Sequence, residues 1–168
     1  MKKRLVEEAK KKEKKEQGIK EEKVIGPEIF YKIDIRVGRI LECEEHPDSE
    51  KLYVEKVDIG SERRKIGSGV KGKVPIEEMS GLCIIVANLK PKRMADFDSH
   101  GMMLFAHDIA NDKFELIRPP EGTPLGERCF LDGINLLNDT SFNTPVKLKS
   151  KDLLACAPDF LTNDKCQV

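Results

Sequence analysis

The chain has 168 residues, of which 39% are apolar and 5% aromatic, with no tryptophan. This length allows one ordinary domain plus a tail or extension, and no apolar run approaches the roughly 18 to 20 residues that span a bilayer. There is no apolar signal region at the start, and the five cysteines are scattered without a Cys-x-x-Cys pair. We therefore expect a soluble, cytoplasmic protein without membrane contact, disulfide framework, metal site or cofactor.

The net charge of zero conceals an uneven distribution of charge. Residues 1–23 carry 10 basic and 6 acidic groups, whereas the rest of the chain carries 20 basic and 24 acidic groups. Within that acidic remainder, residues 63–93 hold eight basic groups against only Glu77 and Glu78. Clustered positive charge is typical of a surface that binds nucleic acid.

Residues 1–27 form a Lys/Glu-rich segment that predicts a helical tail or linker. Its residues are good helix formers, and Glu7 with Lys11 and Glu16 with Lys20 have the favourable four-residue spacing. Apolar residues are too few for a packed face. Two interpretations stay open, a solubilising linker and a basic arm that attracts phosphate without regard to sequence.

Short strand patterns follow in residues 28–118. We expect strands at residues 33–41, 51–59, 63–68, 82–87, 102–106 and 114–117, with a helical turn at Pro75–Met79 between the third and fourth. The first strand should kink at Gly38, and the apolar phase of the second should slip between Val54 and Val57. With no βαβ alternation, this order favours a mainly all-β fold, a five-stranded Greek-key barrel of the oligonucleotide-binding (OB) type.

Residues 119–168 predict a short α/β extension that docks on the barrel. It opens with the punctuating loop Pro119–Pro124 and contains a predicted strand at Arg128–Leu131. An amphipathic stretch follows at Lys147–Cys156, and the extension is too small for a core of its own.

Several strings resemble one family in the same order and spacing. They are Asp34-Ile35-Arg36-Val37-Gly38-Arg39-Ile40, His46-Pro47-Asp48, the string from Leu52 to Gly60, Ser68-Gly69, Asn88-Leu89-Lys90-Pro91 and Ser99-His100-Gly101-Met102-Met103. They resemble the tRNA-binding domain of the endothelial monocyte-activating polypeptide II type, which also occurs in some tyrosyl-, methionyl- and lysyl-tRNA synthetases. The resemblance runs from about residue 30 to the C-terminus, and Pro158–Cys166 resembles the eukaryotic members.

The resemblance implies an OB-fold that recognises the shape of tRNA and catalyses nothing itself. It implies a module that assists an aminoacyl-tRNA synthetase catalytic domain, in cis or in trans, and most simply as its C-terminal domain. It also implies that the extension imitates the dimer interface of bacterial relatives. A monomer with a pseudo-dimer interface is then expected.

Binding to tRNA needs a positive groove for phosphates and a few flat or polar groups for unstacked bases. Asn88 could pair with a base edge, the serines could bond phosphate or ribose, and Gly101 lets the backbone approach a ligand. The plainer interpretations are that Asn88 caps a turn and that the basic residues of the third strand, including Arg64, are a solvated edge. The candidate tRNA-binding residues are Arg63, Lys65, Ser68, Lys71, Lys73, Asn88, Lys90, Lys92, Arg93, Ser99, Gly101 and Met102.

One segment departs from the family pattern. The family usually has Lys-Met-Arg-Gly where this chain has Arg93-Met94-Ala95-Asp96, and Asp98 adds a further negative charge. Losing a phosphate contact flattens the salt dependence of binding by about 0.9 log unit per log unit of salt for duplex. We expect weak, salt-sensitive tRNA binding, aided by the basic tail.

The sequence admits two other functions. A cytokine-like polypeptide released from a synthetase is the main alternative, because the heptapeptide Arg36-Val37-Gly38-Arg39-Ile40-Leu41-Glu42 resembles the one linked to chemoattraction in this family. An enzyme is not favoured, because no nucleophile–base pair, paired carboxylates, P-loop or dinucleotide fingerprint stands out.

Overall fold

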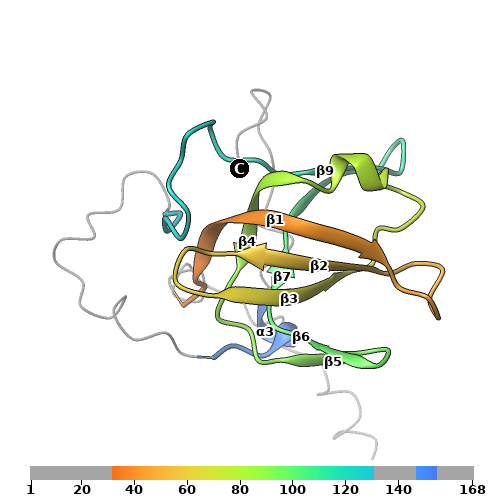
Figure 1. Ribbon diagram of the computed structural model, residues 1–168, viewed down its shortest axis with the longest axis horizontal. Coiled ribbons are helices and arrows are strands. Elements are labelled where there is room, and N and C mark those ends of the chain that lie inside the picture. The colour runs from red at the N-terminus through yellow and green to blue at the C-terminus, as the bar shows by residue number, and fades with distance from the viewer. Residues whose placement is uncertain (1–31, 131–146, 155–168) are drawn as a thin grey trace, which may run out of the picture.

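A computed structural model describes residues 32–130 and 147–154. The predicted helical tail, most of the predicted extension and the string Pro158–Cys166 lie outside these ranges. Strands dominate the described residues (Figure 1). They are β1 (Ile35–Glu45), β2 (Tyr53–Asp58), β3 (Arg63–Ser68), β4 (Gly81–Val86), β5 (Lys92–Met94), β6 (Phe97–Ser99), β7 (Met102–Met103), β8 (Phe105–Asp108) and β9 (Lys113–Leu116), with the 3₁₀ turn η1 (Ile76–Glu78) and the helix α3 (Ser150–Leu154).

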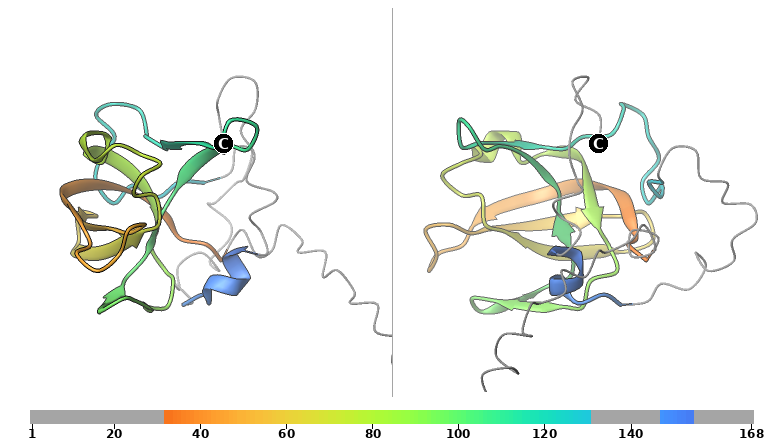
Figure 2. Two further views of the ribbon diagram at one scale, coloured as in Figure 1. Left: turned by 90° about the vertical axis from the view of Figure 1, so that its right-hand side faces the viewer. Right: turned by 180° about the vertical axis from the view of Figure 1, so that it is seen from behind.

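The main sheet is antiparallel and has the strand order β3-β2-β1-β4-β7. It curls into a nearly closed five-stranded barrel, which confirms the predicted all-β, OB-like fold. The β5–β6 and β8–β9 hairpins project on opposite sides of this barrel (Figures 1 and 2). The first hairpin lies below β3 in Figure 1 and belongs to the site described below.

Strand β4 is buried on both faces, as its unbroken apolar sequence predicts. Cys83 and Ile85 face the barrel interior, whereas Ile84 and Val86 belong to a second apolar cluster on the outside of the sheet. Leu148 and Leu153, from the described part of the extension, join this outer cluster. Burying a side chain of this size contributes about 1.5–3 kcal/mol, so these two leucines fasten the extension to the barrel.

Strand β1 changes the face of its apolar side chains at Gly38, since Ile35 and Val37 belong to the outer cluster and Ile40 to the barrel interior, and the kink predicted there stays a prediction. Strand β1 continues through Gly38, and its irregularity is a register shift against β2 between Ile40 and Glu42. The glycine has another role, because a Cβ atom at this position would lie 2.7 Å from Cγ1 of Val57. Gly38 therefore lets β1 and the neighbouring strand approach closely.

The phase slip predicted in the second strand is wrong. Tyr53, Glu55 and Val57 all face inward in regular alternation, and each is 3% exposed or less. Because the middle inward position is the charged Glu55, the apolar residues alone did not reveal this alternation. The barrel interior therefore contains a carboxyl group.

Other local predictions had mixed outcomes. The helical turn after Pro75 is confirmed as η1, whereas β5 and β6 were not predicted. A strand was predicted at Arg128–Leu131, but in the described residues this segment makes an isolated bridge between Arg36 and Arg128. The amphipathic stretch is extended at residues 147–149 and becomes helical at Ser150.

Candidate nucleic-acid interface

Two of the basic stretches seen in the sequence meet at the edge of β3. The backbone N–H of His100 donates to the carbonyl of Lys65 over 2.9 Å, and the N–H of Gly67 donates to Oγ of Ser99 over 3.0 Å. These bonds hold β3 beside the end of the β5–β6 hairpin. Lys65 thereby lies next to that hairpin, with its Nζ 4.6 Å from the centre of the Phe97 ring.

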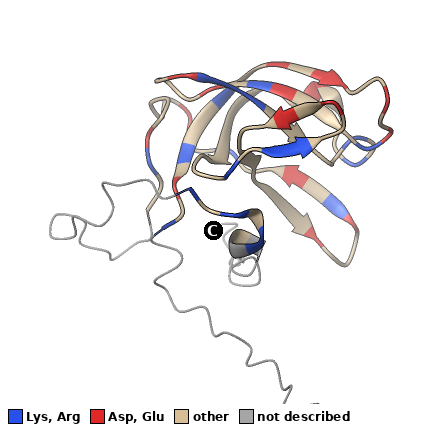
Figure 3. Ribbon diagram, turned by 90° about the horizontal axis from the view of Figure 1, so that it is seen from below, with Lys and Arg blue, Asp and Glu red and all other residues tan. Residues whose placement is uncertain are grey.

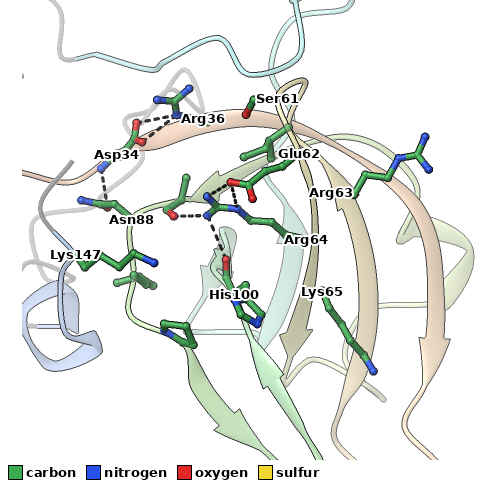
Figure 4. A pocket seen from close by; sticks show the side chains of 14 residues that line it. Asp34, Arg36, Ser61, Glu62, Arg63, Arg64, Lys65, Asn88, His100 and Lys147 are labelled. Atoms are coloured by element: carbon green, nitrogen blue, oxygen red, sulfur yellow. Dashed lines mark hydrogen bonds and ion pairs between the residues drawn. The ribbon is translucent and has the colours of Figure 1, made fainter. Parts of the chain in front are cut away.

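A groove of about 680 Å³ opens on one side of the segment that joins β4 to β5 (Figure 4). Its wall includes four basic side chains besides Arg64, and two acidic ones. We call it the groove; it is lined by Asp34, Arg36, Ile59, Ser61, Glu62, Arg63, Arg64, Lys65, Ala87, Asn88, Leu89, Pro91, His100 and Lys147.

A smaller cavity of about 220 Å³, which we call the slot, shares Leu89 with the groove. Glycines and methionines make up much of its wall, and two lysines complete it. The lining residues are Gly67, Ser68, Gly69, Val70, Leu89, Lys90, Lys92, Met94, Ser99, Gly101, Met102, Met103, Phe105 and Ser150. Flexible, polarizable methionine side chains and bare glycine backbone suit the face of an unstacked base.

Lys65, Lys90 and Lys92 have no carboxylate partner within the residues that the structure describes. In the same part of the chain, the ion-pair contacts of Arg63 with Asp58 and of Arg93 with Asp98 are long, at 3.8 Å each. Unpaired cations attract phosphate most strongly, because no intramolecular ion pair has to be broken first. Seen from the β5–β6 side, basic residues mark β5 and the segment before α3 (Figure 3).

Lys71 and Lys73 line neither the groove nor the slot. The Lys71 ammonium contacts Glu45 at 2.8 Å and the Ser49 carbonyl at 3.2 Å. Lys73 contacts Asp112 at 3.0 Å. The predicted convergence therefore includes β3 and the β5–β6 hairpin, but not these two lysines.

Arg64 and Asn88 hold the wall of the groove together. The Arg64 guanidinium donates to the carbonyls of Ala87 and His100 and to the carboxylate of Glu62. The Asn88 side-chain oxygen accepts from the N–H of Asp34 over 2.9 Å, and its nitrogen donates to the carbonyl of Lys32 over 2.6 Å.

Both serines predicted as ligand contacts are buried. Ser68 is 6% exposed and Ser99 is 3% exposed. The Ser99 hydroxyl accepts from Gly67 and donates to the carbonyl of Gly101 over 3.1 Å. Gly101 packs tightly, since a Cβ atom there would lie 3.1 Å from the carbonyl oxygen of Val86. These residues shape the slot from behind.

The sequence departure at Ala95 and Asp96 forms the turn of the β5–β6 hairpin. Ala95 has a φ of +49°, and Asp96 accepts a hydrogen bond from the buried ring of His46. That bond is the first cause that lowers the pKa of Asp96. Sequence reasoning missed this pair because its members are 50 residues apart.

Sequence reasoning also missed Glu55. Its side chain is fully buried, and neither carboxyl oxygen has a hydrogen-bond partner within the described residues. Burial raises the pKa of Glu55 to about 8, and the nearby Ser68 hydroxyl offsets part of that rise. Glu55 itself lines neither the groove nor the slot.

The heptapeptide Arg36–Glu42 is the middle of the central strand. It pairs with β4 on one side and with β2 on the other. Arg36 is fixed further by two bonds of 3.0 and 2.9 Å to the carboxylate of Asp34. In the folded barrel this segment is therefore not a free peptide, and nothing in the structure supports the cytokine-like alternative.

No group of three or more histidine, cysteine or acidic side chains lies close enough to hold a metal ion in the described part of the chain. Among those same residues, no helix has the length and apolarity needed to cross a membrane.

Comparison with known proteins points to one family. A family profile described as "Putative tRNA binding domain" matches residues 35–128. The chain is 36% identical to "Probable methionine–tRNA ligase" of Oryza sativa subsp. japonica, over 89% of the chain and 20% of that protein. It is 35% identical to "Tyrosine–tRNA ligase, cytoplasmic" of Gallus gallus, over 80% of the chain and 26% of that protein. The chain thus spans 20% and 26% of the length of these two ligases.

A solved structure agrees with the sequence relatives. The crystal structure of a MetRS-related protein from Pyrococcus horikoshii superimposes with a TM-score of 0.60 at 34% identity. The match covers 64% of this chain and 99% of the other. The barrel is therefore the part that the two proteins share.

Proposed function

This chain belongs to the family of tRNA-binding domains, and from that premise we propose that it is a non-catalytic module that presents tRNA to an aminoacyl-tRNA synthetase. The observation that carries the proposal is the groove and slot on either side of the β4–β5 segment. The family match covers the strands that build both cavities.

Phosphates and bases have separate places in this proposal. The unpaired ammonium groups of Lys65, Lys90 and Lys92 attract the backbone, since neutralising phosphates releases bound counterions. The slot, with Met94 and Met102 in its wall, accepts an unstacked base. Ser68, Asn88 and Ser99 act by positioning these surfaces, because their polar groups are already engaged in the fold or buried.

The relatives suggest the partner. Methionine–tRNA and tyrosine–tRNA ligases carry this domain as a small part of a longer chain. We propose that the present chain works with a synthetase catalytic domain, in cis or in trans, in the cytoplasm. The same proposal has three further parts. The chain divides into segments 1–27, 28–118 and 119–168, it catalyses nothing itself, and it has a pseudo-dimer interface. The outer apolar cluster with Leu148 and Leu153 supports the last of these.

A binding titration tests the proposal. Fluorescence anisotropy of labelled tRNA, at low salt and then at rising salt, should show saturable binding with a steep salt dependence. A duplex RNA of equal length should bind more weakly, because it lacks the folded shape and unstacked bases of tRNA. If tRNA and duplex bound equally, or if neither bound at low salt, a tRNA-presenting role would be ruled out.

A further inference from the structure

The C-terminal extension contributes to both cavities of the proposed site. Lys147 lines the groove and Ser150 lines the slot. Both residues lie beyond residue 128, where the match to the family profile ends. The inference drawn from them rests on the proposed function.

The backbone next to Lys147 is fixed to the barrel. Leu148 forms a parallel bridge with Leu89, in which its N–H donates to the carbonyl of Asn88 over 2.9 Å and its carbonyl accepts from the N–H of Lys90 over 2.8 Å. The Leu148 side chain is 7% exposed within the outer apolar cluster. This anchoring fixes the position of the backbone from which the Lys147 side chain extends.

The Lys147 side chain points into the groove. Figure 4 shows its ammonium directed across the cavity towards Arg64 and His100, whereas Arg63 points away. Within the described residues, the ammonium of Lys147 has no hydrogen bond or ion pair. Lys147 contributes less than Arg64 to lowering the pKa of Glu62, and that carboxylate is already engaged by Arg64 at 2.5 Å.

We propose that the extension completes the tRNA-binding surface, and that Lys147 contacts one backbone phosphate of tRNA held in the groove. Most of the other basic side chains that line the groove already have partners. Arg64 is committed to two carbonyls and to Glu62, and Arg36 to Asp34. Lys65 stands at the β5–β6 end of the groove, over Phe97. Lys147 and Lys65 are thus the two lysines that line the groove within the described residues, and of these two Figure 4 shows Lys147 directed across the cavity and Lys65 directed away from it.

The test compares K147A with K149A in the full chain. Lys149 has the same charge two residues further along, but it does not line the groove. At 100 mM salt, K147A should weaken tRNA binding by about three- to tenfold and flatten the slope of log K against log salt by about 0.7 to 0.9. K147R should bind like the wild type, and K149A should lose less than twofold.

The outcomes separate this inference from the proposed function. If the wild type binds tRNA while K147A and K149A have equal affinities and slopes, Lys147 is not a phosphate ligand, and this inference alone fails. If the wild type does not bind tRNA at low salt, the proposed function fails. Thermal melting of each variant shows whether a loss of tRNA affinity comes from unfolding. If K147A unfolds, the comparison of K147R with K147Q tests the phosphate contact. K147R equal to the wild type with K147Q weakened supports the contact, and equal binding by both overturns it.

Discussion

The Nε2 atom of His46 lies 2.7 Å from Oδ1 of Asp96 and joins the loop after β1 to the turn of the β5–β6 hairpin. The His46 ring is 3% exposed, and its Nδ1 accepts from the backbone N–H of Asp48 over 3.1 Å. Because Nδ1 is an acceptor, Nε2 carries the hydrogen and donates it to the aspartate. Asp96, which departs from the family pattern, thus links two loops at one end of the barrel.

Two substitutions of Asp96 should separate the effect of its hydrogen bond to His46 from the effect of its negative charge. D96N keeps an oxygen that accepts from His46 but removes a negative charge beside the basic hairpin. We expect tRNA to bind about twofold more tightly at low salt, which corresponds to a screened interaction over roughly 10 Å. D96A loses the hydrogen bond to His46 as well and should melt at a lower temperature than D96N. Anisotropy titration with parallel melting curves measures both effects, and weaker binding by D96N would contradict this account.

Alanine substitution of lysines should distinguish unpaired from paired cations. K65A and K92A should each flatten the salt dependence of tRNA binding by about 0.7 to 0.9. K71A and K73A should change it much less, because Glu45 and Asp112 already hold these ammonium groups. Titrations at four or more salt concentrations give the slopes. Equal effects from all four variants would place Lys71 and Lys73 in the site as well.

The sequence was informative about the barrel because its signals are local. Alternation of Ile33, Ile35 and Val37 around the start of β1, the unbroken apolar run of β4 and the proline before η1 are each signals within a few residues. Glu55 was missed because a charged side chain at an inward position breaks the apolar count. The full alternation Tyr53, Glu55, Val57 and Ile59 was nevertheless present in the sequence.

The site was harder to predict because it depends on tertiary contacts. Which lysines are unpaired is decided by acids far away in sequence, such as Asp112 for Lys73, which is 39 residues away. Asn88 looked like a ligand because amides recognise bases, yet its amide joins the start of β1 to the β4–β5 segment. Lys147 carried no local signal, since its place follows from the pairing of Leu148 with Leu89.

Filling the slot should reduce tRNA binding without unfolding the barrel. Gly69 lines the slot, and a Cβ atom built there meets nothing within 4 Å. G69L should therefore fold normally and occupy space meant for a base, with an expected loss of at least about fivefold, since stacking of one base is worth about 1–3 kcal/mol. G69A is the matched control, because it makes the same backbone change without filling the slot. If G69L bound tRNA as tightly as G69A, no base would enter the slot.

The last prediction concerns Glu55 and the pH dependence of stability. Its pKa is raised from 4.5 to about 8 in the folded barrel by burial. In the unfolded chain the carboxyl group loses its proton above pH 4.5, whereas the folded protein keeps it up to about pH 8. The unfolded state therefore binds fewer protons in this window, and the free energy of unfolding should fall by about 1.4 kcal/mol per pH unit. The contribution of the protonated Glu55 to stability is fully present below pH 4.5 and is lost as the pH rises through 8.

E55Q retains the shape of the side chain and cannot ionise, so this part of the pH dependence should vanish, and the variant should be more stable than the wild type at pH 8. E44Q, at an exposed position of β1, should leave the profile unchanged. Urea denaturation at several pH values between 4.5 and 8.5 provides the measurement, and parallel profiles for the wild type and E55Q would show that the buried carboxyl group does not hold its proton.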